Sequence, residues 1–357
     1  MLHPHLQDAG PRMIHTIDPL SDPRWEAFVA NHPHASVFHT RGWLAALRCT
    51  YGYEPVVYTT TPAGVALTNG LVFCHVDSRL TGRRLVSMPF ADHCDPLVND
   101  ADDLGHLLRC IERDRRREGW RYVEIRPRTM AVTSTADLEP SQRFYVHSVD
   151  LTPSPEDIFA RFHKDSTQRK IRRAQREKLT YEEGTSRALL ETFYRLLVRT
   201  RRRHEWPPQP LSWFANLVDC LGDSVKIRVA FKSGRPLASI LTLAFRDVLV
   251  YKYGCSDERF HNLGAVHLLF WSAIQDGKAR GAREFDLGRS DCDSPGLIVF
   301  KDRWGAMRAP LTYWRYQGGV RPAGEAGWGA SLARKILARA PKTVLVAAGR
   351  MFYRHFG

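Results

Sequence analysis

The feature that most constrains the fold is a strand, loop, helix and strand that follow one another in the last third of the chain. Residues 248–253 are mostly β-branched and aromatic, which predicts a strand. Residues 262–280 carry apolar side chains at helical spacing, which predicts a buried helix that ends among glycines. Residues 284–288 then predict a second, short strand. A unit of this kind can hold a ligand that carries phosphate groups at the start of its helix.

The start of this helix is the predicted binding site for a ligand that carries phosphate groups and donates a chemical group. Gly264 has no side chain, so a ligand has room to approach the N–H groups of the first turn. The helix dipole favours anions at the same place. The predicted donor-binding residues here are Arg259, Asn262, Gly264 and Ala265. A purely structural turn is the alternative interpretation of the same residues.

The rest of the chain alternates predicted helices and strands. Apolar periodicity predicts helices at 22–31, 41–50, 102–118, 155–178, 187–204 and 211–221. Apolar runs predict strands at 13–17, 55–60, 65–76, 84–88, 122–126, 144–150, 226–232 and 236–245. Strand meanders followed by an α-β crossover in both halves predict an α+β fold. We expect an N-terminal domain at 12–151, a C-terminal domain at 152–320 and a basic helical tail at 321–357.

Positive charge is gathered in a few places. The chain has 52 basic and 38 acidic residues and a net charge of +14. Residues 161–178 hold eight basic and two acidic residues, and residues 321–357 hold seven basic and one acidic. Such clusters favour a polyanionic partner, and the candidates are nucleic acid, an anionic membrane surface and a nucleotide. A solvated surface is the alternative, and we prefer it for the smaller cluster at 113–117.

Several short motifs stand in a characteristic order. They are Phe-His-Thr-Arg-Gly-Trp at 38–43, a basic segment at 164–174, Tyr-Gly-Cys-Ser at 253–256, Asn-Leu-Gly-Ala at 262–265, Phe-Asp-Leu-Gly at 285–288, and Phe300 with Lys301. In this order the chain resembles the Fem-like branch of the GNAT acyltransferases. That branch includes the aminoacyltransferases that build peptidoglycan bridges and acetyltransferase-like proteins of exopolysaccharide clusters. The resemblance implies two tandem GNAT-like domains that transfer an acyl or aminoacyl group to an amine or hydroxyl.

The resemblance also suggests which residues carry the chemistry. In Fem-type enzymes a Phe-Lys pair contacts the end of the aminoacyl-tRNA, and the Lys is thought to assist the transfer. We therefore expect an exposed pair in which Lys301 stabilises the oxyanion and Phe300 contacts the donor. Asp286 and Asp291 are the carboxylates expected to orient or deprotonate an amine. A surface lysine beside a core phenylalanine, and a cap at a strand end, are the structural alternatives.

The remaining site predictions concern phosphate and acceptor binding. Arg289 is expected to grip a phosphate or carboxylate of the donor. The predicted acceptor-binding residues are Asp92, Lys164, Arg169 and Tyr253. The sequence Asp-His-Cys-Asp at 92–95 is not expected to bind a metal, because side chains alternate along an extended segment. We expect no metal and no permanently bound cofactor.

The identity of the two substrates stays open. A long helical hairpin, present in some bridge-forming enzymes, is missing from residues 161–203, which favours an acyl-CoA or acyl-carrier thioester over an aminoacyl-tRNA donor. The expected acceptor is a cell-envelope precursor of exopolysaccharide or peptidoglycan, and an amino acid is a further alternative. A non-catalytic protein that binds nucleic acid or a membrane is the competing hypothesis.

The segments outside the two predicted domains bear on location. The N-terminus lacks the pattern of a signal peptide, and no apolar run is long enough to span a membrane. We therefore expect a cytoplasmic protein, with the inner face of the membrane as an alternative location. Basic and apolar residues alternate in two tail helices divided by Pro341, a pattern typical of helices that lie on anionic membranes. Packing of the tail against the protein itself is the alternative.

Overall fold

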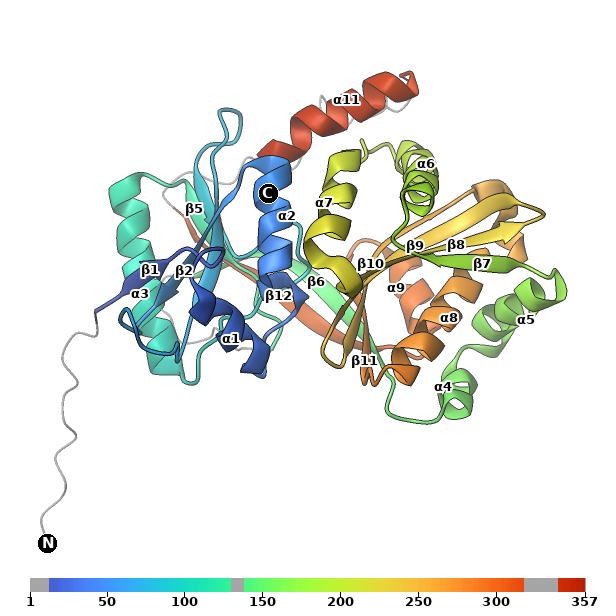
Figure 1. Cartoon of the computed structure of the whole chain (residues 1–357), viewed down its shortest axis with the longest axis horizontal. Coiled ribbons are helices and arrows are strands. Elements are labelled where there is room, and N and C mark those ends of the chain that lie inside the picture. The colour runs from blue at the N-terminus through green and yellow to red at the C-terminus, as the bar shows by residue number, and fades with distance from the viewer. Residues whose placement is uncertain (1–12, 130–137, 318–339, 357) are drawn as a thin grey trace, which may run out of the picture.

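A mixed sheet of 12 strands runs through the whole molecule (Figure 1). The computed structural model describes residues 13–129, 138–317 and 340–356. In sheet order the strands are β1 (His15–Ile17), β2 (Glu54–Thr59), β3 (Leu71–Val76), β4 (Arg84–Val86), β5 (Tyr122–Ile125), β12 (Met307–Gln317), β6 (Glu139–Asp150), β11 (Glu284–Asp291), β10 (Val248–Ser256), β9 (Arg235–Phe245), β8 (Val225–Lys232) and β7 (Thr180–Gly184).

Helices cover the faces of this sheet. They are α1 (Pro23–Asn31), α2 (Arg41–Tyr51), α3 (Ala101–Glu118), α4 (Pro155–Arg161), α5 (Arg169–Arg176), α6 (Arg187–Arg203), α7 (Leu211–Leu221), α8 (Ala265–Ala279), α9 (Pro295–Asp302) and α11 (Lys342–Phe352). The predicted α+β class is confirmed.

The same β-α-β unit occurs once in each half. Strands β4 and β5 pair in parallel and are joined by α3, whereas β10 and β11 pair in parallel and are joined by α8. The other strand pairs are antiparallel. A parallel pair needs a crossover, and a helix supplies it in both halves. The paired residues end at Val86 and Glu124 in the first unit and at Val250 and Asp286 in the second.

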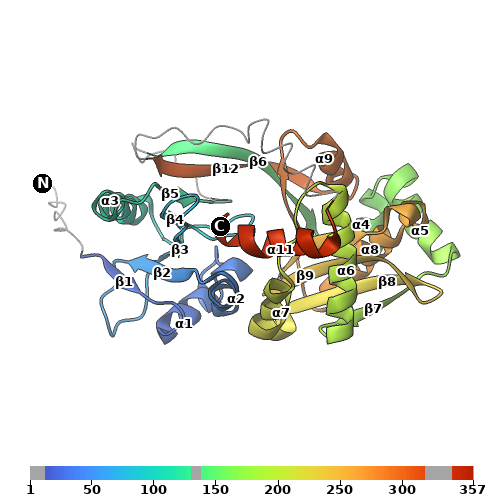
Figure 2. The ribbon, with the colours of Figure 1, turned by 90° about the horizontal axis from the view of Figure 1, so that it is seen from above.

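Two long strands tie the halves together. Strand β12 comes from the C-terminal part of the chain but lies between β5 and β6, and β6 pairs with β11 on its other side. Figure 2 shows β6 and β12 running side by side from one half of the molecule into the other. Helices α2 and α7 also pack together, with the rings of Trp43 and Trp213 5.3 Å apart. One hydrophobic core therefore includes side chains from both halves.

Some predicted elements are wrong in detail. The helix expected at 155–178 is broken after α4, where Phe162 is extended and packs on Trp304 at 5.0 Å between ring centroids. A π-helical turn (Lys164–Gln168) follows, and the amide of Gln168 donates to the carbonyls of Phe159 and Phe162. The expected strand 65–76 begins only at Leu71. Strands β7 and β12 and helix α9 were not predicted.

The described part of the predicted tail packs against the protein. In α11, Leu345 is fully buried, and a side chain at Gly349 would collide with the carbonyl of Pro208. The hydroxyl of Tyr53 donates to the carbonyls of Tyr353 and Arg354 just beyond the helix. Residues 318–339, where the first tail helix was predicted, lie outside the described residues. Helix α11 therefore packs against the protein itself, which was the alternative to a tail that lies on a membrane.

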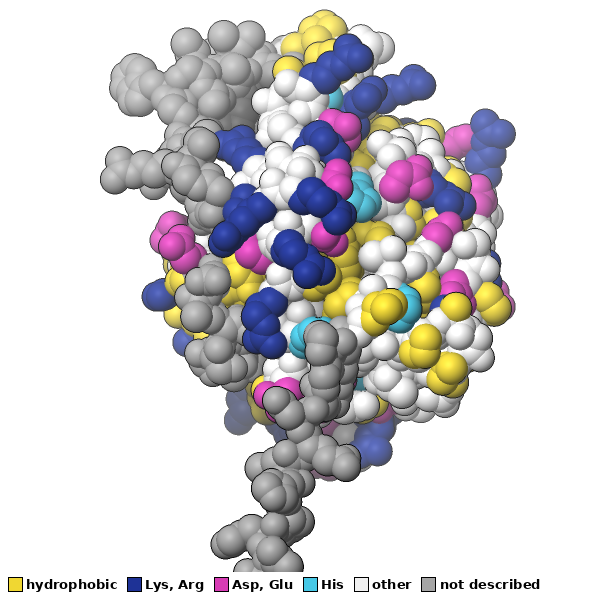
Figure 3. Space-filling view, turned by 90° about the vertical axis from the view of Figure 1, so that its left-hand side faces the viewer, with side chains coloured by type: hydrophobic (Ala, Val, Ile, Leu, Met, Phe, Trp, Pro, Cys, Tyr) yellow, Lys and Arg dark blue, Asp and Glu magenta, His cyan; other side chains and the backbone are white. Residues whose placement is uncertain are grey.

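The smaller basic cluster at 113–117 lies on the exposed face of α3, where dark-blue side chains run over the helix in Figure 3. Arg115 and Arg116 both pair with Glu112, and Arg117 pairs with Asp114. Arg115 is buried, whereas Arg113, Arg116 and Arg117 are exposed, so most of the cluster is a solvated face, as we preferred from the sequence.

Candidate active site

Strands β10 and β11 separate after their short parallel pairing, and the gap is the centre of the candidate site. Beyond Val250 and Asp286, β10 continues along β9, while β11 continues along β6 after an irregularity between Asp286 and Arg289. Gly288 lies in this irregularity at φ +70°, and the carboxylate of Asp92 would stand 3.0 Å from any Cβ there. A loop of the N-terminal half therefore enters the gap where only glycine leaves room for it.

Asp92 is the centre of the first group of charges in this gap. Its Oδ2 accepts a hydrogen bond from Nζ of Lys252 at 2.9 Å, and its Oδ1 lies 3.9 Å from Nε of Arg289. Burial alone would raise the pKa of Asp92, but the positive charges of Lys252 and Arg289 together lower it. Tyr313 donates its hydroxyl hydrogen to the backbone carbonyl of Asp92 and accepts a hydrogen bond from Arg289. The carboxylate is thus ionised and fixed in place.

The second group is built on Asp286, which is fully buried. Its Oδ2 lies 2.8 Å from Nε2 of His93 and 3.6 Å from a guanidinium nitrogen of Arg128, and its Oδ1 accepts from the Gly288 N–H. Burial opposes ionisation, but the hydrogen bond and charge of His93, with Arg128, hold the pKa of Asp286 far below the usual range. Nδ1 of His93 is buried and has no hydrogen-bond partner in the part of the chain that the structure describes. A carboxylate that orients an imidazole by one nitrogen leaves the other as a proton acceptor.

Lys301 lies behind this gap rather than on the surface. Only 2% of its surface is exposed, and its Nζ donates to the carbonyls of Gly288 and Arg289, each at 2.8 Å. Burial lowers the pKa of Lys301 to about 8, although the charges of Asp92 and Asp286 oppose the shift. The expected exposed pair is therefore wrong, because helix α9 turns Lys301 inward and packs Phe300 against Phe270.

A cavity of about 260 Å³ opens onto the charges of Asp92. Lys252, Tyr253 and Arg289 line it, as does Tyr353 from the C-terminal segment. The hydroxyl of Tyr253 accepts a hydrogen bond from the indole of Trp213 at 2.8 Å, which fixes the ring. This cavity brings together three of the residues predicted from sequence, Asp92, Tyr253 and Arg289.

The predicted donor helix is α8, and its N-terminus faces a second cavity. The helix begins at Ala265, one turn later than expected, because Gly264 at φ +79° ends a preceding 3₁₀ helix (Glu258–Leu263). No side chain caps the first N–H groups of α8. The adjoining cavity, of about 220 Å³, is lined by Lys170, Val266 and Phe300 among others.

Our reason for the glycine at position 264 is wrong. A Cβ there would lie 2.2 Å from the backbone carbonyl oxygen of Lys170, so α5 already fills the space beside the glycine. Gly264 is needed for the left-handed turn and for the close packing of α5 against α8. Donor binding at the α8 N-terminus remains a prediction that depends on the cavity beside Ala265 and Val266 instead.

Other predicted site residues lie apart from these cavities. Arg259 forms an ion pair with Asp257 at 2.6 Å, and Asn262 is exposed in the 3₁₀ helix. Lys164 and Arg169 are exposed on the π-helical turn and the start of α5, and α5 packs against α8. Asp291 is exposed at the end of β11, five residues beyond Asp286.

The sequence analysis missed three residues of the charge cluster. His93 was considered only as a member of the segment 92–95 and was given no role of its own, although its position next to Asp92 marks it as part of the same loop. Lys252 is a charged residue in an otherwise apolar strand, which is a local signal for a buried ion pair. Arg128 gives no local signal, because its partners Asp286 and Glu284 are more than 150 residues away.

Comparison with known proteins agrees with this geometry. Residues 161–296 match the family model of the acetyltransferase (GNAT) domain. Among solved structures, FemX superposes with a TM-score of 0.67 at 13% identity, over 88% of this chain and 98% of FemX. L-PGS from Bacillus licheniformis gives 0.56 at 15% identity over 89% and 98% of the two chains, respectively. A tandem GNAT protein from the clavulanic acid biosynthesis pathway gives 0.53 at 9% over 87% and 100%.

These likenesses in structure establish the fold, and the family model establishes the domain type. A comparison with curated protein sequences gives no significant match. In the described ranges, no helix has the length and apolar character needed to cross a membrane. The resemblance predicted from the sequence motifs is confirmed at this level: residues 161–296 match the acetyltransferase (GNAT) domain, and the chain as a whole has the tandem GNAT-like fold seen in FemX.

Proposed function

We propose that this protein is an acyltransferase that moves an acyl or aminoacyl group onto an amine or hydroxyl of a cell-envelope precursor. The observation that carries the proposal is the N-terminus of α8, which has no side-chain cap among the described residues and faces a cavity, and which follows the strand that pairs with β11. Helix α8 and both strands lie within the segment that matches the GNAT domain. The helix proposed to hold the donor and three members of the charge cluster, Lys252, Asp286 and Arg289, thus belong to the same β-α-β unit.

The donor we favour is a thioester of coenzyme A or of an acyl carrier, with aminoacyl-tRNA as the alternative. Free N–H groups and the helix dipole at Ala265 and Val266 attract phosphate oxygens. Lys170 adds a positive charge on the wall of the same cavity. Phe300 lines the cavity as well, which agrees with contact between this residue and the donor.

The charge cluster supports the steps of acyl transfer. The acceptor must lose a proton, and we propose that Nδ1 of His93 takes it while Asp286 positions the ring. The tetrahedral intermediate carries negative charge, and we assign its stabilisation to Lys252, Arg289 and Lys301. Lys301 acts from a fixed position, because two carbonyls hold its ammonium in a buried place where charge is weakly screened.

The acceptor is proposed to enter the cavity of about 260 Å³ beside Asp92, Tyr253 and Arg289. A hydroxyl or amine of an exopolysaccharide or peptidoglycan precursor is the class we favour, and we expect the reaction in the cytoplasm or at the inner face of the membrane. Catalysis, donor and acceptor are thus all open to direct test.

Donor binding is the first experiment. Titration calorimetry with a coenzyme A thioester and with charged tRNA should give saturable binding to one of them. Lys170→Met should weaken that binding. Lys342→Met removes the same charge from an exposed position on α11 and should leave the binding unchanged. Absence of binding to both donors, at low and at moderate salt, would contradict the proposal.

A further inference from the structure

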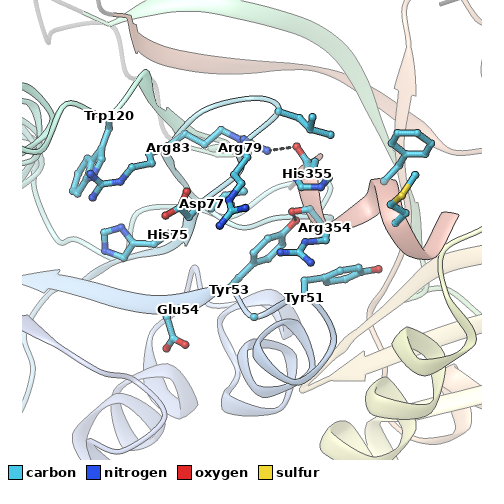
Figure 4. Close-up of a pocket in the computed structure, with 16 residues that line it drawn as sticks. Tyr51, Tyr53, Glu54, His75, Asp77, Arg79, Arg83, Trp120, Arg354 and His355 are labelled. Carbon is cyan, nitrogen blue, oxygen red and sulfur yellow. Dashed lines mark hydrogen bonds between the residues drawn. The ribbon is translucent and has the colours of Figure 1, made fainter. Parts of the chain in front are cut away.

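A large cavity lies away from the charge cluster, between the N-terminal half and the end of the chain. It measures about 1230 Å³ and is bounded by the start of β2, the loop between β3 and β4, and the segment after α11. Figure 4 shows Arg79, Arg83 and Arg354 around this space, with Trp120 and His75 at one end and Tyr51 and Tyr53 near Arg354. None of our proposals for the transfer reaction uses it.

The wall of this cavity is held by a set of hydrogen bonds. Arg84, which is buried, donates to the carbonyl of His355 at 2.7 Å, and Thr81 donates to the same carbonyl at 2.9 Å. Ser78 lies 2.8 Å from Nδ1 of His355. The C-terminal segment is therefore fixed to the β3–β4 loop, and the cavity between them is a built feature of the fold.

Positive charge on the cavity wall is not neutralised. The side chains of Arg79 and Arg354 form no hydrogen bond or ion pair with any described residue, and both residues are exposed. Arg83 makes a single bond, of 3.3 Å, to the carbonyl of Glu118. Glu54 and Asp77 also line the cavity, so four arginines, with Arg84, face two carboxylates. Arg115, Arg116 and Arg117 of α3 differ, because they pair with acids of their own helix.

We propose that this cavity binds the phosphate group of a ligand that carries at least two negative charges, with Arg79, Arg83 and Arg354 as its anion-binding residues. A guanidinium presents five donors in a planar fork that matches phosphate oxygens. Two such forks without partners, in one cavity of this size, are satisfied together by one multiply charged anion. A ligand with a single carboxylate would leave most of these donors unused.

Two sources of such a phosphate group are distinguishable, a lipid headgroup and a soluble phosphorylated molecule. Exposed apolar side chains line the same cavity, since 67% of Leu80 and 57% of Met351 is exposed. Apolar side chains beside arginines are typical of sites that meet an anionic membrane. The C-terminal segment lines both this cavity and the cavity of about 260 Å³ beside Asp92. Arg354 and His355 line the first, and Tyr353 and Phe356 line the second.

The test compares one double variant with a control of equal charge. Arg79→Gln with Arg354→Gln removes the two partner-free guanidinium groups and should leave the melting temperature unchanged. Arg187→Gln with Arg280→Gln removes the same charge from surface ion pairs elsewhere. The control is needed because a net charge of +14 attracts any anionic surface. Binding to inorganic pyrophosphate is measured by calorimetry, and binding to phosphatidylcholine vesicles with and without phosphatidylglycerol by co-flotation.

We expect the double variant to bind the recognised probe about 100-fold more weakly, or about tenfold for each arginine. The control should bind as the wild type does. Loss of vesicle binding alone identifies a lipid headgroup, and loss of pyrophosphate binding identifies a soluble phosphate ligand. The proposal is overturned if the wild type binds neither probe, or if both double variants bind equally well.

Discussion

In the N-terminal half the parallel pair β4–β5 ends at Val86 and Glu124, and in the C-terminal half the pair β10–β11 ends at Val250 and Asp286. Both carboxylates are buried, but their partners differ. Glu124 is held by the guanidinium groups of Arg126 and Arg315, which cannot lose their protons. Asp286 is held by Arg128 and by His93, whose second nitrogen has no partner among the described residues. The buried carboxylate of one unit is thus paired with arginines alone, and that of the other also orients an imidazole.

The helices of the two units also differ, in whether side chains cap their N-termini. The N-terminus of α3 is capped by Asp100, and Asp102 and Asp103 stand in its first turn, so carboxylates already satisfy its dipole. The N-terminus of α8 has no side-chain cap and no acid in its first turn, and it faces a cavity. The same topology therefore has a helix N-terminus satisfied by carboxylates in one half (α3, the closed helix) and an uncapped N-terminus that faces a cavity in the other (α8, the open helix).

Removal of the positive charge of Lys301, which lies behind the gap between β10 and β11, should have the largest effect. Lys301→Met should lower the catalytic rate by about 10²–10³-fold, since one oxyanion-stabilising group typically contributes that much. Lys301→Arg should recover only part of the rate, because a planar fork does not replace a compact ammonium. The rate and the melting temperature are measured on the same variants.

A paired lysine outside the gap serves as the control for this prediction. Lys226 forms ion pairs with Glu183 and Asp276, so Lys226→Met should affect stability and not turnover. A rate for Lys301→Met within about twofold of wild type would show that the residue only supports the fold.

Gly264→Ala tests whether the glycine before α8 is needed for the packing of α5 against α8. The added methyl group would meet the carbonyl of Lys170, and φ is +79°, so we expect unfolding to become easier by roughly 2–4 kcal/mol. Gly281→Ala at φ +89° has open space around it and should cost only about 1 kcal/mol. Denaturant unfolding measures both, and equal losses would contradict the packing role of Gly264.

The pH dependence of turnover should report Lys301. Its pKa is lowered to about 8, so the ammonium is present below that pH and is lost as the pH rises through it. If the ammonium is needed, the rate should fall above pH 8 by up to about tenfold per pH unit. Because arginine stays charged, Lys301→Arg should not show this fall. An identical descending limb in both proteins would assign it to another group.

Much of the fold follows from local patterns, and much of the site does not. Apolar periodicity predicted α6, α7 and β10 to within a few residues, because each buries one face over its whole length. The break at Phe162 depends on Trp304, and the position of β12 between β5 and β6 depends on pairing with distant strands. Neither leaves a signal in the neighbouring sequence.

The same limit applies to the candidate site. Asp92, Arg289 and Lys301 were singled out by residue type and by resemblance to known motifs, and they do lie around one gap. The pairing of His93 with Asp286 joins residues 193 positions apart, which no periodicity records. The direction of Lys301 was also wrong, because α9 is too short and too apolar to give a clear amphipathic pattern.

The comparison between the open and the closed helix is tested most directly by donor titration of two reciprocal variants. Val266→Asp places in α8 the acid that Asp102 supplies in α3, and it should weaken binding of a coenzyme A thioester by about tenfold or more. Val266→Asn controls for shape and should bind nearly as well as wild type. Asp102→Asn, in the closed helix, should change nothing. The account predicts that only the acid in α8 impairs binding; equal affinity in all four proteins would contradict it.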